Sequence, residues 1–190
     1  MKLADTLSTD RLLLRPAVTG DRAAIVALLS DFEVVRMTAS VPYPYRDEHA
    51  DRWIGETVDR SRDNGARAII CNGTLVGVIG FAPSSSAIAE IGYWLGRAYW
   101  GRGIMSEAGK AMIDDVFLYN DLAEIRATTF VDNPASGRVL SKLGFAETDR
   151  GFGTSLARGD DRIPEVRMRL MRETVSALEG DKTRHRSGAA

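Results

Sequence analysis

The sequence has few of the residues that build disulfides, metal sites and membrane spans. Among 190 residues there are two histidines and one cysteine, Cys71. A single cysteine cannot form an intrachain disulfide, and its apolar neighbours indicate a buried thiol rather than a nucleophile. No apolar run is long enough to cross a bilayer, and residues 1–11 lack the apolar core of a secretory signal. We therefore expect a cytoplasmic protein with no metal site and no membrane contact.

Charge of neither sign dominates the chain. Lys and Arg number 25 and Asp and Glu number 26, which gives a formal net charge of −1. This balance supplies no overall field that would draw the protein onto nucleic acid, so we expect no nucleic-acid partner. With 44% hydrophobic residues, the chain is long enough to fill one core. We predict a single domain over 1–175 and a flexible polar tail over 176–190.

Alternating and helical hydrophobic patterns divide the chain into mixed elements. Strands are predicted at 11–15, 66–71, 74–81, 87–95, 124–131, 145–150 and 163–170. Helices are predicted from Thr19 or Asp21 to Phe32, and over 47–62, 105–119 and 134–143. Asn72-Gly73 is a two-residue hairpin signal, so 66–95 should form an antiparallel meander. A helix joins the strands 87–95 and 124–131, which predicts that they are parallel neighbours.

Two loops have roles that the pattern leaves open. The segment VPYPY, residues 41–45, contains two prolines and two tyrosines. These tyrosines either cover an edge of the core or line a substrate cleft. The segment RGDDR, residues 158–162, mixes both charges and could form an acceptor loop or a solvated one, of which we expect the solvated loop.

The stretch 91–108, IGYWLGRAYWGRGIMSEA, passes from a strand through a glycine-rich turn into a helix. Free N–H groups at a helix start bind anions, glycines let an anion approach the backbone, and Arg102 can pair with phosphate oxygens. The P-loop pattern fails because Ile104-Met105 replace its Lys and Ser or Thr. The dinucleotide pattern fails because Ser106 stands at its third glycine. The spacing leaves two interpretations open, a phosphate site and a tight structural turn.

Three motifs resemble the GNAT superfamily of acetyl-CoA-dependent N-acetyltransferases, in particular its branch of ribosomal-protein N-terminal (alanine) acetyltransferases. They are TDRLLLRP at 9–16, EIGYWLGRAYWGRGIMSEA at 90–108 and NPASGRVLSKLGF at 133–145. The resemblance covers about 9–170. It implies an α/β fold whose mixed, mostly antiparallel sheet is splayed at the centre and carries helices on both faces.

The resemblance also implies a site for acetyl-CoA as co-substrate. In this family the glycine loop and the helix after it bind the pyrophosphate of coenzyme A, and the splayed strand pairs with the pantetheine arm. The corresponding loop and helix residues are Gly101, Arg102, Gly103, Ile104, Met105 and Ser106. The strand residues are Tyr93, Trp94 and Leu95, and Asn133 stands where the branch contacts the pantetheine region. Many members have Gln or Arg where this chain has Ala98.

Acetyl transfer to an amine requires a base for the amine, a donor for the thioester carbonyl and a proton for the departing thiolate. The two histidines lie far from the motifs in sequence, so the base candidates are carboxylates. Glu90, at the start of the splayed strand, is the first candidate and Glu165 a further one. Glu107, in the first turn of the phosphate helix, is assigned a structural role.

Three candidates remain for the group that protonates the departing thiolate. Many GNAT enzymes use a tyrosine at the position that Leu140 occupies here. Ser136 matches a serine that the branch uses near the thiol, and it could equally cap the first helical turn. A third possibility is that water protonates the thiolate.

The resulting prediction is an acetyl-CoA-dependent N-acetyltransferase that acts on a primary amine, possibly a protein N-terminal α-amine. Two alternatives stay open: a small-molecule acetyltransferase for a polyamine, amino sugar or antibiotic, and a non-catalytic acyl-CoA-binding module. Exposed edges of the final strands would also permit a homodimer.

Overall fold

The computed structural model describes residues 1–58 and 65–175. One eight-stranded sheet runs through it in the order β1-β2-β3-β4-β5-β6-β8-β7. The strands are β1 Leu7–Ser8, β2 Leu12–Arg15, β3 Arg67–Cys71, β4 Thr74–Pro83, β5 Ile88–Leu95, β6 Glu124–Phe130, β7 Ala146–Gly153 and β8 Ile163–Met171. The helices are α1 Arg22–Leu29, α2 Phe32–Val35, α3 Asp47–Val58, α4 Ile104–Tyr119 and α5 Pro134–Lys142. The predicted tail 176–190 and the end of the predicted helix 47–62 lie outside the described residues.

The first half of the sheet is antiparallel, as the sequence predicts. The hairpin between β3 and β4 has Asn72 at φ 49° and Gly73 at φ 75°. Two consecutive positive φ angles are the geometry of a type I′ turn, which follows the twist of the flanking strands. β4 then pairs antiparallel with β5, from Gly77 opposite Leu95 to Pro83 opposite Ala89. The predicted meander is therefore confirmed.

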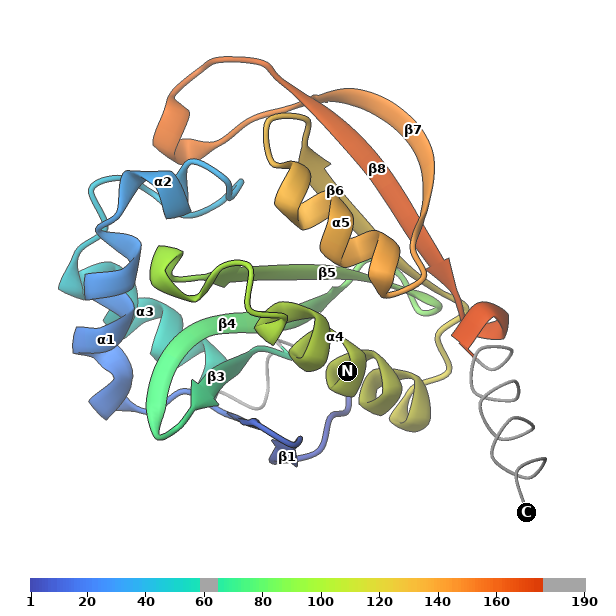
Figure 1. Ribbon diagram of the computed structural model, residues 1–190, viewed down its shortest axis with the longest axis horizontal. Helices are drawn as coiled ribbons and strands as arrows, with labels where there is room; N and C mark the ends of the chain where they lie inside the picture. The colour runs from blue at the N-terminus through green and yellow to red at the C-terminus, as the bar shows by residue number, and fades with distance from the viewer. Residues whose placement is uncertain (59–64, 176–190) are drawn as a thin grey trace.

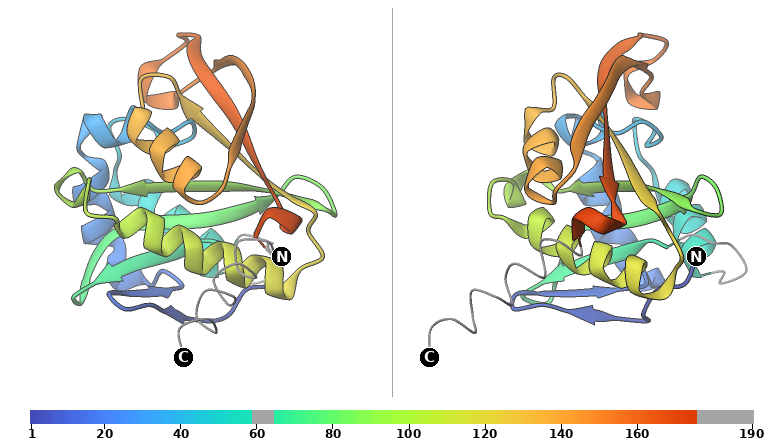
Figure 2. Two further views of the ribbon diagram at one scale, coloured as in Figure 1. Left: turned by 45° about the vertical axis from the view of Figure 1, so that its right-hand side comes forward. Right: turned by 90° about the vertical axis from the view of Figure 1, so that its right-hand side faces the viewer.

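The sheet opens between β5 and β6. These strands are parallel, as predicted, but pair only from Ile88 opposite Glu124 to Glu90 opposite Arg126. Beyond that point β5 continues along β4, while β6 continues along β8 to the pair Phe130 and Glu165. Figure 2 shows β6, β8 and β7 diverging from the rest of the sheet. The splayed, mostly antiparallel sheet of the sequence prediction is confirmed.

Helices cover both faces of the sheet (Figure 1). On the face of α4 and α5, the larger core gathers Ile91 and Leu95 of β5 with Met112 and Val116 of α4. On the opposite face, α1 and α3 pack over a second apolar cluster that includes Ile25 and Ile54. The two clusters hold β5 between them, so successive side chains of this strand reach opposite sides of the sheet.

The helix predicted from position 19 or 21 to Phe32 is divided in the structure. α1 ends at Leu29, and the hydroxyl of Ser30 donates to the carbonyl of Val26 at 2.7 Å. Asp31 is extended, at φ −80° and ψ 111°, and its carboxylate accepts the N–H of Glu33 at 3.1 Å. Asp31 therefore caps a separate short helix, because an Asp with extended backbone satisfies the free amides of a new helical start.

Candidate active site

The glycine loop between β5 and α4 has the geometry of an anion-binding turn. Gly101 and Gly103 have φ angles of 73° and 75°, in the left-handed region that favours glycine. Gly103 directly precedes the first residue of α4, Ile104. The N–H groups of Ile104, Met105 and Ser106 therefore lie in the first turn, where no helical carbonyl precedes them. Such a turn attracts an anion through free donors and the positive end of the helix dipole.

Residues of the N-terminal segment hold this turn in place. Glu107 accepts hydrogen bonds from the Thr9 hydroxyl at 2.5 Å, from the Arg11 backbone N–H at 3.1 Å and from the Arg11 Nε at 2.7 Å. Arg11 also donates to the carbonyl of Arg102 at 3.1 Å. We call Thr9, Arg11 and Glu107 the loop clamp. It gives Glu107 the structural role predicted for it.

The loop clamp perturbs the acidity of Glu107. Partial burial by itself would raise the pKa of this carboxyl. The hydrogen bonds from Thr9 and Arg11, with the nearby guanidinium charge, outweigh burial and lower the pKa below its ordinary value. The carboxylate therefore stays charged at neutral pH, and the positive first turn of α4 faces a fixed negative group.

One cavity of about 1310 Å³ brings the predicted site together. Its lining includes all the residues predicted to bind the coenzyme and the two first candidates for acid and base: Glu90, Tyr93, Trp94, Leu95, Gly101, Arg102, Gly103, Ile104, Met105, Ser106, Asn133 and Ser136. Glu165, the further base candidate, is not part of this lining, and its carboxylate accepts from Arg167 at 3.1 Å. The geometry therefore favours Glu90 over Glu165.

The two faces of β5 divide the cavity into two sides. Ala89 and Ile91 are buried in the core under α4, so Glu90 between them faces the side of α1 and α3. Gly92 is on the same side as Glu90, and a Cβ built on it would meet nothing within 4 Å. Tyr93 packs on the α4 side. The cavity therefore has one side at the glycine loop and one side at Glu90, and the gap between β5 and β6 lies between them.

The hydroxyls of Tyr93 and Ser136 lie 2.9 Å apart, at the start of α5. Asn133 caps this helix, since its side-chain oxygen accepts the N–H of Ser136 at 3.2 Å. Burial raises the pKa of Tyr93 to about 12, and the hydrogen bond with Ser136 offsets burial only in part. Tyr93 is therefore a neutral hydroxyl at physiological pH and can donate a proton in a hydrogen bond. The sequence pattern gave no sign that these two side chains meet.

The carbonyl oxygen of Leu95 already has a partner. The indole N–H of Trp100 donates to it at 2.8 Å. Trp100 also lines the cavity, next to the glycine loop. This contact fixes the end of β5 against the loop, and a pantetheine arm would share the carbonyl or use the backbone before it.

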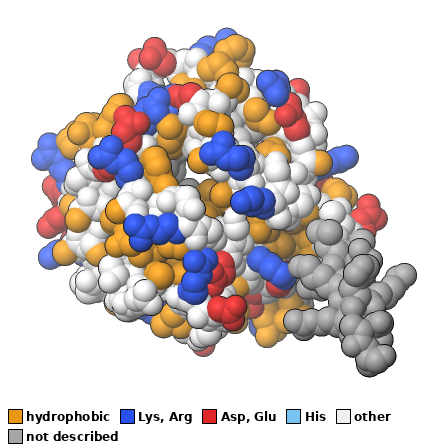
Figure 3. Space-filling model, viewed as in Figure 1, with side chains coloured by type: hydrophobic (Ala, Val, Ile, Leu, Met, Phe, Trp, Pro, Cys, Tyr) orange, Lys and Arg blue, Asp and Glu red, His pale blue; other side chains and the backbone are white. Residues whose placement is uncertain are grey.

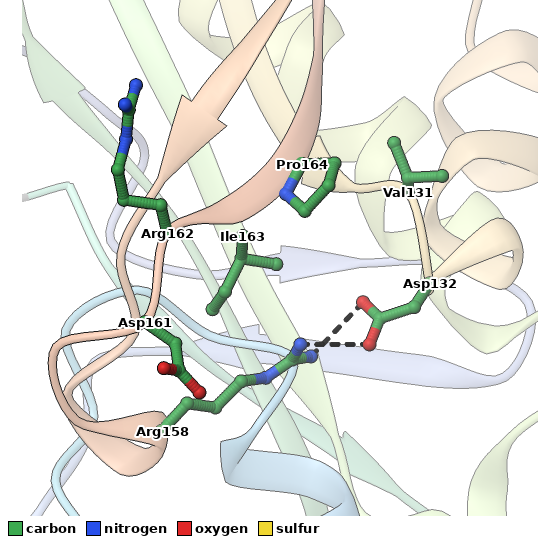
Figure 4. Close-up of a pocket in the computed structure, with 7 residues that line it drawn as sticks. All are labelled: Val131, Asp132, Arg158, Asp161, Arg162, Ile163 and Pro164. Carbon is green, nitrogen blue, oxygen red and sulfur yellow. Dashed lines mark hydrogen bonds and ion pairs between the residues drawn. The ribbon is translucent and has the colours of Figure 1, made fainter.

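The connection between β7 and β8 closes one wall of the cavity. The N–H of Leu156 donates to the carbonyl of Ala39 at 3.0 Å, and both residues line the cavity. Arg158 donates to the carbonyl of Arg36 at 2.6 Å and to both oxygens of Asp132 at 2.8 and 3.1 Å. Figure 4 shows this pairing beside a smaller pocket of about 370 Å³. We call residues 155–158 the strap.

The strap corrects one end of a prediction from the sequence. A solvated loop was expected at 158–162, and residues 159–162 are exposed, but the Arg158 side chain is only 13% exposed. Hydrogen bonds from Arg158, reinforced by the charges of Arg158 and Arg36, lower the pKa of Asp132 although partial burial opposes them. The charge pattern of this segment gave no signal, because Asp132 and Arg36 are distant in sequence.

Comparison with known proteins identifies the family of this chain. Residues 11–146 match the family model of the acetyltransferase (GNAT) domain. This match covers more than half of the chain. The chain belongs to the GNAT acetyltransferase family.

Relatives of this GNAT protein are bacterial acetyltransferases. An uncharacterised N-acetyltransferase, p20 of Bacillus licheniformis, is 33% identical over 86% of this chain and 94% of its own length. The ribosomal-protein-serine acetyltransferase of Escherichia coli is 38% identical over 37% of this chain and 41% of its own length. The L-amino acid N-acetyltransferase AaaT of Escherichia coli is 28% identical over 78% of this chain and 91% of its own length.

Solved structures share the fold. The structure described as RimL, a ribosomal L7/L12 alpha-N-protein acetyltransferase in complex with coenzyme A, superposes with a TM-score of 0.74. It is 21% identical and covers 87% of this chain and 97% of its own. The GNAT protein is thus an acyltransferase enzyme in a family that uses acetyl-CoA.

The residues present fit acetyl-CoA. The anion-binding turn, the open edge of β5 and the 1310 Å³ cavity are continuous, as a long phosphorylated thioester requires. In the described part of the chain, no cluster of three or more potential metal ligands is found. Nor does any helix there have the length and apolar character needed to cross a membrane.

Proposed function

We propose that the enzyme transfers the acetyl group of acetyl-CoA to a primary amine across the gap between β5 and β6. The observation that carries this proposal is the single cavity, which joins the amides at the start of α4 to the Glu90 side of the sheet. With the phosphates of acetyl-CoA at the α4 end of the cavity and the amine at the Glu90 end, the thioester would lie in the gap between β5 and β6.

On the coenzyme side, the amides of Ile104, Met105 and Ser106 bind the pyrophosphate, with Gly101 and Gly103 allowing its close approach. Arg102 lines the same end of the cavity and adds a full positive charge. The open edge of β5, from Tyr93 to Leu95, offers backbone groups to the amides of the pantetheine arm. Asn133 lines the same cavity and caps α5.

The chemistry forms one bond and breaks another. The amine nitrogen attacks the thioester carbonyl, a C–N bond forms, the C–S bond breaks, and the proton leaving nitrogen is replaced by one on sulfur. Glu90 accepts the amine proton directly or through one water, because it is an exposed carboxylate on the acceptor side of the splay. A backbone N–H on β5 holds the carbonyl oxygen.

Ser136 supplies the proton to the thiolate. Its hydroxyl is held by the neutral hydroxyl of Tyr93 at 2.9 Å, so the pair forms a short relay at the start of α5. Leu140 of the same helix, which stands where many family members have a tyrosine, is buried and apolar and cannot supply this proton. A thiolate is a good leaving group, and a weak acid is enough for this step.

The acceptor is a protein N-terminus or a small amine. The names of two similar proteins, a ribosomal-protein-serine acetyltransferase and the L7/L12 enzyme, support the first. The name of the L-amino acid enzyme and the wall formed by the strap support the second. The cavity accommodates either reaction at its Glu90 side.

Thermal unfolding in the presence of ligands tests this function. A ligand at about 100 times its Kd stabilises the folded state by roughly 2.7 kcal/mol, which corresponds to a Tm increase of roughly 5–10 °C for a chain of this size. Acetyl-CoA and coenzyme A should give this shift, and ATP and NAD should not. Absence of a shift at saturating acetyl-CoA would contradict the proposal.

Turnover is then measured as thiol release with a panel of amines. Glu90→Gln should bind acetyl-CoA as the wild type does but lose roughly 100-fold or more in kcat, as expected for a general base. Glu147→Gln is the matched control, because Glu147 is an exposed β7 carboxylate that pairs with Arg150. Full turnover by Glu90→Gln would remove Glu90 from the mechanism.

A further inference from the structure

Helix α3 and the residue ahead of it turn one polar face toward the acceptor side of the cavity. Tyr45, His49, Arg52, Trp53 and Glu56 all line it. They recur at intervals of three or four residues, which is the spacing of one helical face. The sequence analysis offered Tyr45 as a possible cleft residue but gave no role to His49, Arg52 or Glu56, which lie far from the glycine loop in sequence.

Two of these side chains are hydrogen-bond donors. The Nδ1 of His49 accepts the N–H of Arg46 at 3.0 Å, so the ring donates through Nε2. Tyr45 lies against this ring at 5.3 Å between centroids. Burial raises the pKa of Tyr45 to about 12, while the nearby charge of Arg52 acts in the opposite direction. The Tyr45 hydroxyl therefore keeps its proton.

Arg52 adds a full positive charge to these donors. It forms no ion pair with any residue in the described ranges 1–58 and 65–175, and its electrostatic effect on Tyr45 indicates that the two groups are close. The other acidic groups of the cavity do not neutralise it. Asp132 is bound by Arg36 and Arg158, and Glu56 makes interactions of its own.

Glu90 lies across the cavity from this face. It projects from β5 toward the side of α1 and α3, and Gly92 beside it leaves open space. Trp94 of the same strand face and Trp53 of α3 pack on one apolar cluster, which brings strand and helix together. A molecule held between them would meet a carboxylate at one end and a cluster of donors at the other.

We propose that the acceptor is a small amine that also carries a carboxylate or phosphate group, with Arg52 binding the anion while the amine lies at Glu90. His49 and Tyr45 donate to the same anion. This inference rests on the proposed amine acetylation and specifies its substrate class. The strap favours a small acceptor, because the bond from Leu156 to Ala39 adds a wall to the cavity.

Matched acceptors test the inference with the full chain and saturating acetyl-CoA. L-amino acids with small, apolar and acidic side chains are compared with their amides, and phosphoethanolamine is compared with ethanolamine. In one of these two comparisons, we expect kcat/KM to be at least about tenfold higher for the anionic acceptor than for the neutral one. A hydrogen bond to a charged group provides a difference of this size. A higher kcat/KM for the amino acids than for their amides would identify the anion as a carboxylate. A higher kcat/KM for phosphoethanolamine than for ethanolamine would identify it as a phosphate.

Variants assign the preference to Arg52. Arg52→Gln should abolish the preference for the anionic acceptor by raising its KM, with little change for the neutral one and none in the Tm shift caused by coenzyme A. Arg52→Lys should keep part of the preference, because it retains the charge but not the planar fork. Arg22→Gln is the control, since Arg22 forms an exposed ion pair with Asp51 and does not line the cavity.

The outcomes separate this inference from the proposed function. Acetylation of polyamines, neutral amines or peptide N-termini in preference to anionic amines overturns the inference and leaves amine acetylation intact. A preference for anions that survives Arg52→Gln also overturns it. Failure to release coenzyme A with every amine tested, despite binding of acetyl-CoA, contradicts the proposed function itself.

Discussion

At the scale of single residues, the pair of Tyr93 and Ser136 gives the first prediction. Ser136→Ala should lower kcat by roughly ten- to 100-fold and leave the KM for acetyl-CoA nearly unchanged, because in the proposed mechanism the hydroxyl acts only when sulfur departs. Tyr93→Phe should lower kcat less, since Ser136 would keep its own proton. Steady-state kinetics with thiol detection measures both.

The control for this pair comes from the same helix. Ser141 is exposed on α5, and its hydroxyl donates to the carbonyl of Gly137 at 3.0 Å. Ser141→Ala should retain wild-type kcat. If Ser136→Ala also does so, water protonates the thiolate and the serine serves only the first turn of α5.

Glu107 provides a prediction with a defined pH dependence. Its pKa is lowered in the folded protein, so the charged form stabilises the fold above the unfolded-state pKa, and this stability is lost as pH falls through the folded-state value. Glu107→Gln should therefore cost about 1–3 kcal/mol of unfolding free energy at about pH 7. The difference from wild type should shrink steadily below about pH 4.5, the ordinary value for Glu.

Urea unfolding at several pH values measures this dependence. Asp114→Asn is the matched control, because Asp114 is an exposed carboxylate on the same helix and pairs with Lys110. Its cost should be small, as for other surface ion pairs. An unchanged difference between wild type and Glu107→Gln from neutral to acidic pH would contradict the loop clamp.

At the scale of elements, the strap links the β7–β8 connection to the segment after α2. Arg158→Gln removes a bidentate bond to Asp132 and the bond to the Arg36 carbonyl. The amide of Leu156 should then lose protection in hydrogen exchange, because its bond to Ala39 opens with the strap. We expect the KM for the acceptor to rise several-fold and the KM for acetyl-CoA to stay constant.

Asp160→Asn is the control for the strap, since Asp160 lies in the same connection and outside the cavity lining. Equal protection of Leu156 in wild type and Arg158→Gln would show that the backbone bond alone holds this wall. A rise in the KM for acetyl-CoA would instead place the strap in the coenzyme site.

Elements whose signal is local could be predicted from the sequence. Asn72-Gly73 fixes a hairpin, Asn133-Pro134 starts a helix, and the glycines at 101 and 103 mark the turn before α4, because each acts through its own backbone preference. The glycine-loop side of the cavity follows from these local signals. The division of the helix at Ser30-Asp31 was missed because its apolar spacing continues across the break.

Contacts between distant segments could not be predicted in the same way. Thr9 and Glu107 are 98 positions apart, and nothing in either segment specifies the other. The same holds for Arg158 with Arg36, and for His49 and Arg52, whose place beside Glu90 depends on how α3 packs on the sheet. Periodicity determines which face of α3 is polar, but only the fold determines what that face meets.

At the scale of the whole molecule, the arrangement of charge differs from the net charge. The chain is nearly neutral, yet Arg102 of the glycine loop and Arg138 and Lys142 of α5 line the cavity. None of the three has an ion pair with a residue that the structure describes. Figure 3 shows Lys and Arg side chains across the middle of this face, where α4 and α5 lie. Clustered cations at a cleft mouth raise the local concentration of an anionic ligand.

This arrangement predicts a salt-dependent association with coenzyme A. Raising ionic strength from about 10 mM to about 150 mM shortens the screening length from roughly 30 Å to roughly 8 Å. The association rate, measured by stopped flow, should fall roughly fivefold or more, while the dissociation rate changes less. Acetyl-pantetheine lacks the phosphates and should associate at a rate that salt barely affects. A Lys142→Gln, Arg138→Gln double variant should reproduce at low salt most of the loss that salt causes in wild type, whereas equal salt dependence for both ligands would mean that the cations on α5 do not guide the coenzyme.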